Sequence, residues 1–166
     1  MTDQPAVAQR RADIRSSLEQ AHSAFHELLT SLNNEHLSLR SGSGWGARDV
    51  ATHLVISIER VPALIEALRR GHDYLNFPSP VFERLRGLHL WWSARHVSWA
   101  TLARRLDAAY PPIFALLETI RDDEWGRSGH AYGEGLWTVQ SALTHQLDHT
   151  EEHIHQIREL IGRTGS

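Results

Sequence analysis

Apolar residues at helical spacing run through three long segments of this chain and, with interruptions, through a fourth. Apolar positions at i, i+3, i+4 and i+7 are typical of an amphipathic helix that packs against a core. The segments cover about 6–33, 46–70, 94–121 and 137–161, and no convincing alternating strand pattern lies between them. The sequence therefore predicts an all-α fold, an antiparallel four-helix bundle, as a single domain over residues 1–166.

Prolines interrupt two of the predicted helices. Pro62 lies inside the second helix and should kink it, because proline lacks the N–H and its ring clashes with the preceding turn. The pair Pro111-Pro112 should break or kink the third helix midway for the same reason. Residues 71–95 are less regular, so we expect a long irregular connection between the second and third helices.

The composition excludes several kinds of chemistry. The chain has no cysteine, which excludes disulfides, thiolate metal ligands and a cysteine nucleophile. It has no lysine either, so all 17 basic residues are arginine and a Schiff base with a side-chain amine is excluded. The net charge is −3 and the arginines are scattered, so we expect no nucleic-acid partner.

Hydropathy and the N-terminal residues indicate a cytoplasmic protein. No apolar stretch approaches the length of a membrane span, so we expect no membrane partner. The first residues, MTDQPAVAQRRADIRSS, lack the apolar run of a signal peptide. With 166 residues, 41% of the composition apolar and 22% charged, the chain can bury an ordinary globular core.

Histidine is unusually frequent: the chain has 12, and four of them fall between positions 145 and 155. His145, His149 and His153 are spaced i, i+4, i+8, so neighbouring pairs lie one turn apart and can reach one ion. By helical phase, His153 lies roughly 80° from the centre of the apolar stripe, His149 roughly 120° and His145 roughly 160°. The sequence therefore favours His149 with His153 as the ligand pair and places His145 toward the rim.

A third ligand must come from another helix, and His53 is the best candidate. Its neighbours Val50, Leu54 and Ser57 form the inward face of the second helix, where a histidine needs a polar partner. A core histidine bonded to a backbone carbonyl is the alternative interpretation.

A weak internal repeat marks the starts of the second and fourth helices. Trp45 and Trp137 are each followed eight residues later by a histidine. Each tryptophan should precede its helix, with the next residue, Gly46 or Thr138, in the N-cap position. Common capping chemistry and a true duplication both explain the repeat.

Two segments resemble the signatures of the DinB-like superfamily. GWGARDVATHL, which contains His53, resembles its helix-two signature, and HQLDHTEEHIHQI resembles its helix-four signature HxxxHxxxHxxQ, with Gln156 as the glutamine. The resemblance implies a four-helix bundle with one divalent metal ion held by His53, His149 and His153. Gly46 departs from the usual Ser or Thr after the tryptophan, which removes a cap but no ligand.

Three neutral imidazoles leave positions open for water or substrate, as in catalytic rather than structural sites. Imidazole ligands suit zinc, nickel, iron or copper, and we expect zinc or nickel first. The DinB-like superfamily, which the two segments resemble, includes mycothiol- and bacillithiol-dependent enzymes. This implies a transferase that acts on a small-molecule substrate with such a low-molecular-weight thiol, in detoxification or stress response. Two alternatives remain: a metal-binding bundle without catalysis, and a hydrolase that uses hydroxide on the metal.

The surroundings of the predicted metal are less well defined by the sequence. Gln156 lies about one turn from His153, and with His145 it is a candidate pocket residue. Trp91 and Trp92 are candidates for a pocket wall or a homodimer contact, although core aromatics need no such role. Four carboxylates are candidate partners of the imidazoles, although solvated surface charges are more common: Glu19, Asp49, Asp148 and Glu152.

Overall fold

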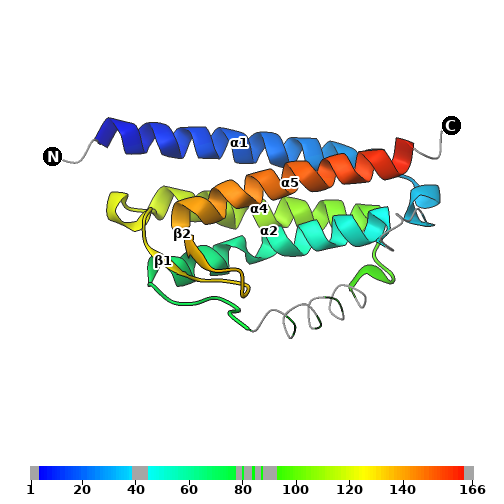
Figure 1. Ribbon diagram of the computed structural model, residues 1–166. Helices are drawn as coiled ribbons and strands as arrows, with labels where there is room; N and C mark the ends of the chain where they lie inside the picture. The colour runs from blue at the N-terminus through cyan, green and yellow to red at the C-terminus, as the bar shows by residue number, and fades with distance from the viewer. Residues whose placement is uncertain are drawn as a thin grey trace.

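Four long helices lie side by side and form a bundle (Figure 1). The structure, a computed structural model, describes residues 4–38, 45–77, 80, 84, 87 and 93–162. The helices are α1 (Gln4–Ser31), α2 (Ala47–Arg69), α4 (Trp99–Thr119) and α5 (Val139–Gly162). The shorter described elements are the 3₁₀ turns η1 (Asn34–Ser38) and η2 (Asp122–Glu124) and the strands β1 (Ser128–His130) and β2 (Leu136–Thr138). The predicted all-α four-helix bundle is confirmed.

The order of the helices around the bundle is α1, α4, α2, α5 (Figure 1). Hydrogen bonds between the helices show that α2 and α5 run antiparallel, as do α1 and α4. α2 and α4 instead run parallel, because Glu59 pairs with Arg105 and, further along both helices, Arg69 contacts Thr119. The long connection between α2 and α4 allows this arrangement, since it returns the chain to the end of the bundle where α2 began.

The predicted apolar stripes face the interior of the bundle. The fully buried large side chains come from all four helices, and burying each contributes about 1.5–3 kcal/mol relative to exposure. They include Leu18 and Phe25 of α1, Leu54, Ile58, Ile65 and Leu68 of α2, Leu102, Leu106, Ile113 and Leu117 of α4, and Val139 and Ile157 of α5. This core fixes the relative positions of the helices that carry the site.

The third helix begins later than the apolar stripe predicts. The prediction was a start at about 94, whereas α4 begins at Trp99. Ser98 is its N-cap, and its Oγ accepts a hydrogen bond from the Thr101 N–H at 3.1 Å. A capping serine satisfies an otherwise unpaired N–H of the first turn, so the cap sets this boundary.

The helix α4 continues through Pro111 and Pro112, where a break or kink was predicted. Each proline removes one bond to the carbonyl four residues earlier, on Asp107 or Ala108. Both prolines and both of these carbonyl residues are exposed. Water can therefore replace the lost hydrogen bonds on the outer side of the helix. Pro62 likewise lies within α2 without ending it.

A short antiparallel hairpin of β1 and β2 precedes α5, in a segment where no strand was predicted. Gly129 of β1 pairs with Trp137 of β2. Gly129 also packs tightly on the turn after α2, because a Cβ there would lie 2.2 Å from the His72 carbonyl oxygen. Strands of three residues are too short to show an alternating pattern, so the sequence could not indicate them.

The connection between α2 and α4 is described only in part. Its described positions Pro80, Arg84 and Gly87 have helical backbone. Trp91 and Trp92 lie outside the described residues, so the pocket wall and the homodimer contact expected there stay predictions. The single domain over 1–166 also stays a prediction. Among the described helices, none combines the length and apolar character of a membrane span.

Candidate metal centre

Three histidines from two helices converge on one point. His53 lies in the second turn of α2, and His149 and His153 lie one turn apart on α5. The ligand atoms of the three side chains all lie within 4.8 Å of one another. The structure therefore brings together the three residues that the sequence predicts as metal ligands.

The spacing of the imidazole nitrogens fits one ion. His53 Nε2 lies 3.2 Å from His149 Nε2. Two nitrogens about 2.05 Å from a tetrahedral ion lie about 3.3 Å apart, so little movement is needed. The His53 ring is nearly perpendicular to the rings of His149 and His153, at 88° and 82°. The rings can therefore aim nitrogens at one point without clashing face to face.

Gln156 sets the tautomer of His153. His153 Nδ1 lies 2.9 Å from Gln156 Oε1. An amide oxygen can only accept, so Nδ1 carries the proton and Nε2 keeps the lone pair that a metal needs. Metal-binding histidines usually donate their other N–H in this way. Gln156, a candidate pocket residue from the sequence, is therefore the hydrogen-bond partner of a predicted ligand.

His145 lies at the rim of the site, as its helical phase indicates. Its side chain is exposed, and its ring stacks on His149 with 5.5 Å between centroids and 18° between planes. Its ring also contacts Trp137, with the centroids 4.6 Å apart. The group of converging ligand atoms does not include it.

The internal repeat corresponds to the same contact at two helix starts. The rings of Trp45 and His53 meet edge to face with centroids 5.5 Å apart, and those of Trp137 and His145 at 4.6 Å. Each tryptophan thus supports the histidine that follows it by eight residues. Only the first of the two histidines belongs to the triad, so the repeat is one of local packing rather than of ligation.

Both helices that carry the triad have defined starts. Thr138 caps α5 as predicted, because its Oγ1 accepts from the Ser141 N–H at 3.0 Å and Ser141 Oγ accepts from the Thr138 N–H at 2.8 Å. Gly46 is the N-cap of α2, and Asp49 Oδ2 accepts its N–H at 2.9 Å. These capping hydrogen bonds define the residue at which each helix begins, and so the position of each histidine along its helix.

A polar network beside the triad was not predicted. Ser57, one turn after His53, donates to Gln146 Oε1 at 2.9 Å. Gln146 Nε2 then donates to Thr150 Oγ1 at 3.2 Å, and both residues are buried. The sequence held one indication of this network: Ser57 lies on the inward face of α2, where its hydroxyl needs a polar partner. The network ties α2 to α5 close to the histidines.

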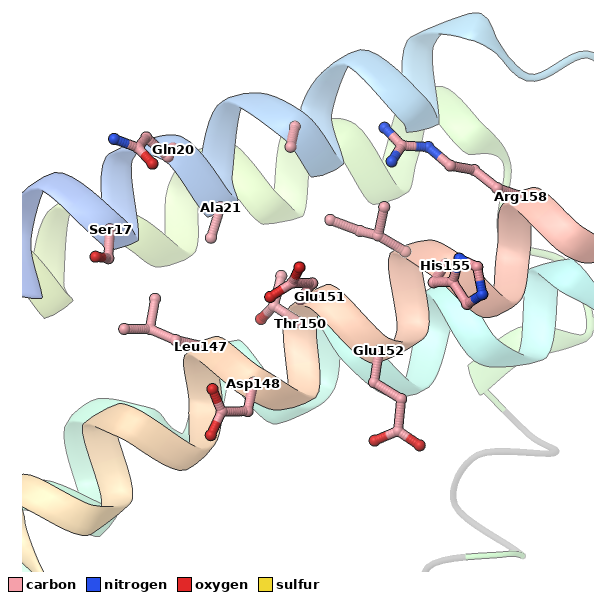
Figure 2. Close-up of a pocket in the computed structure, with 12 residues that line it drawn as sticks. Ser17, Gln20, Ala21, Leu147, Asp148, Thr150, Glu151, Glu152, His155 and Arg158 are labelled. Atoms are coloured by element: carbon pink, nitrogen blue, oxygen red, sulfur yellow. The ribbon is translucent and has the colours of Figure 1, made fainter.

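Two of the four candidate carboxylates have other partners, and the other two line a groove. Asp49 accepts a backbone N–H at the start of α2, and Glu19 pairs with an arginine of α1. Asp148 and Glu152 line a groove between α1 and α5, and none of its 12 lining residues belongs to the triad (Figure 2). The described hydrogen-bond partner of His153 Nδ1 is the amide of Gln156.

The sequence profile of the DinB superfamily matches residues 17–157, which include all three converging histidines. The chain belongs to the DinB superfamily. No curated protein matches it. Among solved structures, this DinB-superfamily chain is similar to YfiT from Bacillus subtilis, with a TM-score of 0.76 and 19% identity, over 95% of this chain and 89% of YfiT. YfiT is described as a probable metal-dependent hydrolase with an unusual four-helix bundle topology, and at this identity the similarity shows a shared fold.

Proposed function

We propose that the chain binds one divalent metal ion through His53, His149 and His153. We further propose that it is a metal-dependent transferase that acts on a small electrophile with a low-molecular-weight thiol, such as bacillithiol or mycothiol. The convergence of three imidazoles from α2 and α5 supports the metal site. The thiol is what the resemblance of the two helix segments to the DinB-like superfamily implies. All three side chains are half-buried and His153 Nε2 is a buried atom, so the bundle shields the site from bulk solvent. Three protein ligands also leave a coordination position for a reactant, as in catalytic sites.

The residues around the triad supply orientation and an apolar surface. A bound divalent ion would act as a Lewis acid that lowers the pKa of a coordinated thiol or water. Gln156 holds His153 in the ligating tautomer. Trp137 and Tyr132, whose ring centroids are 6.0 Å apart, continue from His145 as an aromatic surface. Such a surface suits the apolar part of a small electrophile.

The nucleophilic sulfur must come from a second substrate, because the chain has no cysteine. In the proposed reaction, the thiol sulfur forms a bond to an electrophilic carbon of the acceptor. The leaving group departs with the electron pair of the bond that breaks, and the thiol proton passes to solvent. No residue of the chain is oxidised or modified.

Hydrolysis by water is the second candidate, and the description of YfiT as a probable metal-dependent hydrolase favours it. A hydrolase needs a base that takes a proton from the attacking water. His145 at the rim, stacked on His149, is a described side chain that can fill this role. The two candidates therefore share the metal site and differ in the nucleophile.

The ligand set is tested by the metal content of untagged protein, measured by mass spectrometry. We expect His53→Ala and His149→Ala each to lose one equivalent of metal per chain. His155→Ala is the matched control, because this exposed histidine of α5 pairs with Glu159 outside the triad. Far-UV circular dichroism checks that each variant is folded. Full metal content in His53→Ala would refute the ligand set.

The reaction is tested with a panel of thiols and a halogenated nitroaromatic electrophile. Turnover that requires both metal and thiol, and that is lost in His53→Ala, is the expected result. Ester hydrolysis that requires metal but no thiol would favour the hydrolase instead. Metal-loaded protein without turnover in either assay would indicate a bundle that binds metal without catalysis.

A further inference from the structure

A second group of ligand-type side chains lies between α1 and α4. His22 and His26 stand one turn apart on α1 and both meet Asp107 of α4. His22 Nε2 lies 2.9 Å and His26 Nδ1 2.8 Å from the same carboxylate oxygen, Asp107 Oδ1. The α1–α4 interface is opposite the α2–α5 interface that holds the triad (Figure 1). We propose that His22, His26 and Asp107 form a second divalent metal site, independent of the first.

The donor set of this group is chemically suited to a transition metal. Two imidazoles and one carboxylate on one face of an ion, with open positions opposite, is a recurrent arrangement for iron(II) and related metals. Ligand atoms about 2.1 Å from an octahedral ion lie about 3.0 Å apart along an edge. The observed N–O separations of 2.8 and 2.9 Å are close to that edge, and the three ligand atoms lie within 4.8 Å of one another. Each of these nitrogens shares a proton with Asp107, so an ion that binds here displaces those protons to solvent or to the other ring nitrogen.

The side chains are held in position by their neighbours. The His22 ring packs on buried Tyr110, with the ring centroids 4.6 Å apart. The His22 and His26 rings meet edge to face at 6.1 Å. Because these contacts restrict both imidazoles before any ion binds, the site needs little ordering on binding.

Charge and exposure also suit an ion that arrives from solvent. The side chains of His22, His26 and Asp107 are 29%, 38% and 45% exposed, so an ion can reach them without opening the bundle. The Asp107 carboxylate lies within hydrogen-bonding distance of both imidazoles and supplies the negatively charged oxygen ligand of the group. A bound ion would join α1 to α4.

The test uses full-length chain in which the triad has been removed by His53→Ala and His149→Ala. Isothermal titration with Co²⁺ should give about one ion per chain in this variant. The weak visible absorption typical of six-coordinate rather than four-coordinate cobalt should accompany it. Adding His26→Gln or Asp107→Ala should each weaken binding at least tenfold. His155→Gln, at an exposed histidine that also pairs with a carboxylate, should leave binding unchanged.

Two results would overturn the proposal. The first is that the variant without the triad binds no Co²⁺. The second is that its Co²⁺ binding survives His26→Gln combined with Asp107→Ala, which would mean that scattered surface histidines are responsible. The affected side chains are partly exposed, and circular dichroism of each variant separates lost binding from lost folding. Neither result bears on the triad, whose metal is measured in the otherwise unchanged chain.

Discussion

His153 is the triad residue whose orientation the structure explains most directly. Its Nδ1–H donates to Gln156 Oε1 at 2.9 Å, and the two residues are three positions apart on α5. Side chains three apart on a helix are neighbours, so α5 alone can build this contact. The amide therefore favours the ligating tautomer whether or not the other histidines are in place.

Replacing Gln156 tests this role. Gln156→Leu should weaken metal binding at the triad about 10- to 100-fold, because a ligand loses the group that orients it. Gln156→Glu should retain binding, since a carboxylate accepts the same N–H. Affinity is measured by competition with a coloured chelator, with Gln140→Leu, at an exposed glutamine of α5, as the control. Equal affinities of Gln156→Leu and the wild-type chain would show that the hydrogen bond has no part in binding.

Glu124, just after α4, makes stability depend on pH. Its side chain is 4% exposed, and it accepts hydrogen bonds from the Arg121 N–H at 2.8 Å and Arg69 Nε at 3.0 Å. Burial raises the pKa of Glu124, but these bonds and the arginine charges outweigh it, so the folded-state pKa lies below the usual 4.5. A carboxylate with a lowered pKa stabilises the fold above its unfolded-state pKa and loses that contribution as pH falls through its folded-state pKa.

Glu124→Gln should therefore lower the free energy of unfolding by about 2 kcal/mol at pH 7. The difference from wild type should shrink as the pH is lowered below 4.5, because the wild-type carboxylate becomes protonated. Urea unfolding of the wild-type and Glu124→Gln chains, at pH 7 and again below pH 4.5, measures this difference in the free energy of unfolding. Glu118→Gln, at an exposed residue of α4, is the control. A difference that stays the same at low pH would contradict this explanation.

At the scale of elements, the β1–β2 hairpin connects the end of α2 to the start of α5. The Tyr74 N–H, after α2, donates to the His130 carbonyl of β1 at 2.9 Å. Arg127 Nη1, just before β1, donates to the Arg69 carbonyl at the end of α2 at 2.9 Å. The hairpin also carries Trp137, which packs on His145. It therefore holds together the ends of the two helices that carry the triad.

Gly129→Ala tests how closely β1 must approach α2. The added Cβ would lie 2.2 Å from the His72 carbonyl oxygen, so backbone must shift, and we expect a loss of about 1–3 kcal/mol. Gly126→Ala is the control, because no atom lies within 4 Å of its Cβ position. Chemical unfolding of both variants gives the comparison. If Gly129→Ala were as stable as Gly126→Ala, the close packing of the hairpin would not matter for stability.

For the whole molecule, an ion at the triad would cross-link α2 and α5 through residues 96 positions apart. A ligand that binds only the folded state, present at 100 times its Kd, stabilises by about 2.7 kcal/mol. In a chain of 166 residues this corresponds to a rise in Tm of about 5–10 °C. Thermal unfolding of chelator-treated protein, before and after Zn²⁺ is added back, should show this shift. In the His149→Ala variant, the rise in Tm on adding Zn²⁺ should be smaller, because the ion at the triad is lost. A rise in Tm as large as in the wild-type chain would show that the stabilising ion binds elsewhere.

Local patterns in the sequence determined the helices and part of the site. The predicted segments 46–70 and 137–161 match α2 and α5 to within two residues, because apolar periodicity and capping positions are local properties. The phase of α5 likewise separated His149 and His153 from exposed His145. Where a local signal was weak, as in the three-residue strands, the prediction missed the element.

Tertiary structure alone decided which faces meet. The phase of α2 says that His53 points inward, but the packing of α2 on α5 places it 3.2 Å from His149. The same holds for the buried pair Ser57 and Gln146. His22 and His26 also have i, i+4 spacing, yet nothing local relates them to Asp107 of α4. Periodicity fixes the direction of a side chain about its own helix, whereas the neighbour it meets depends on how the chain connects and packs the helices.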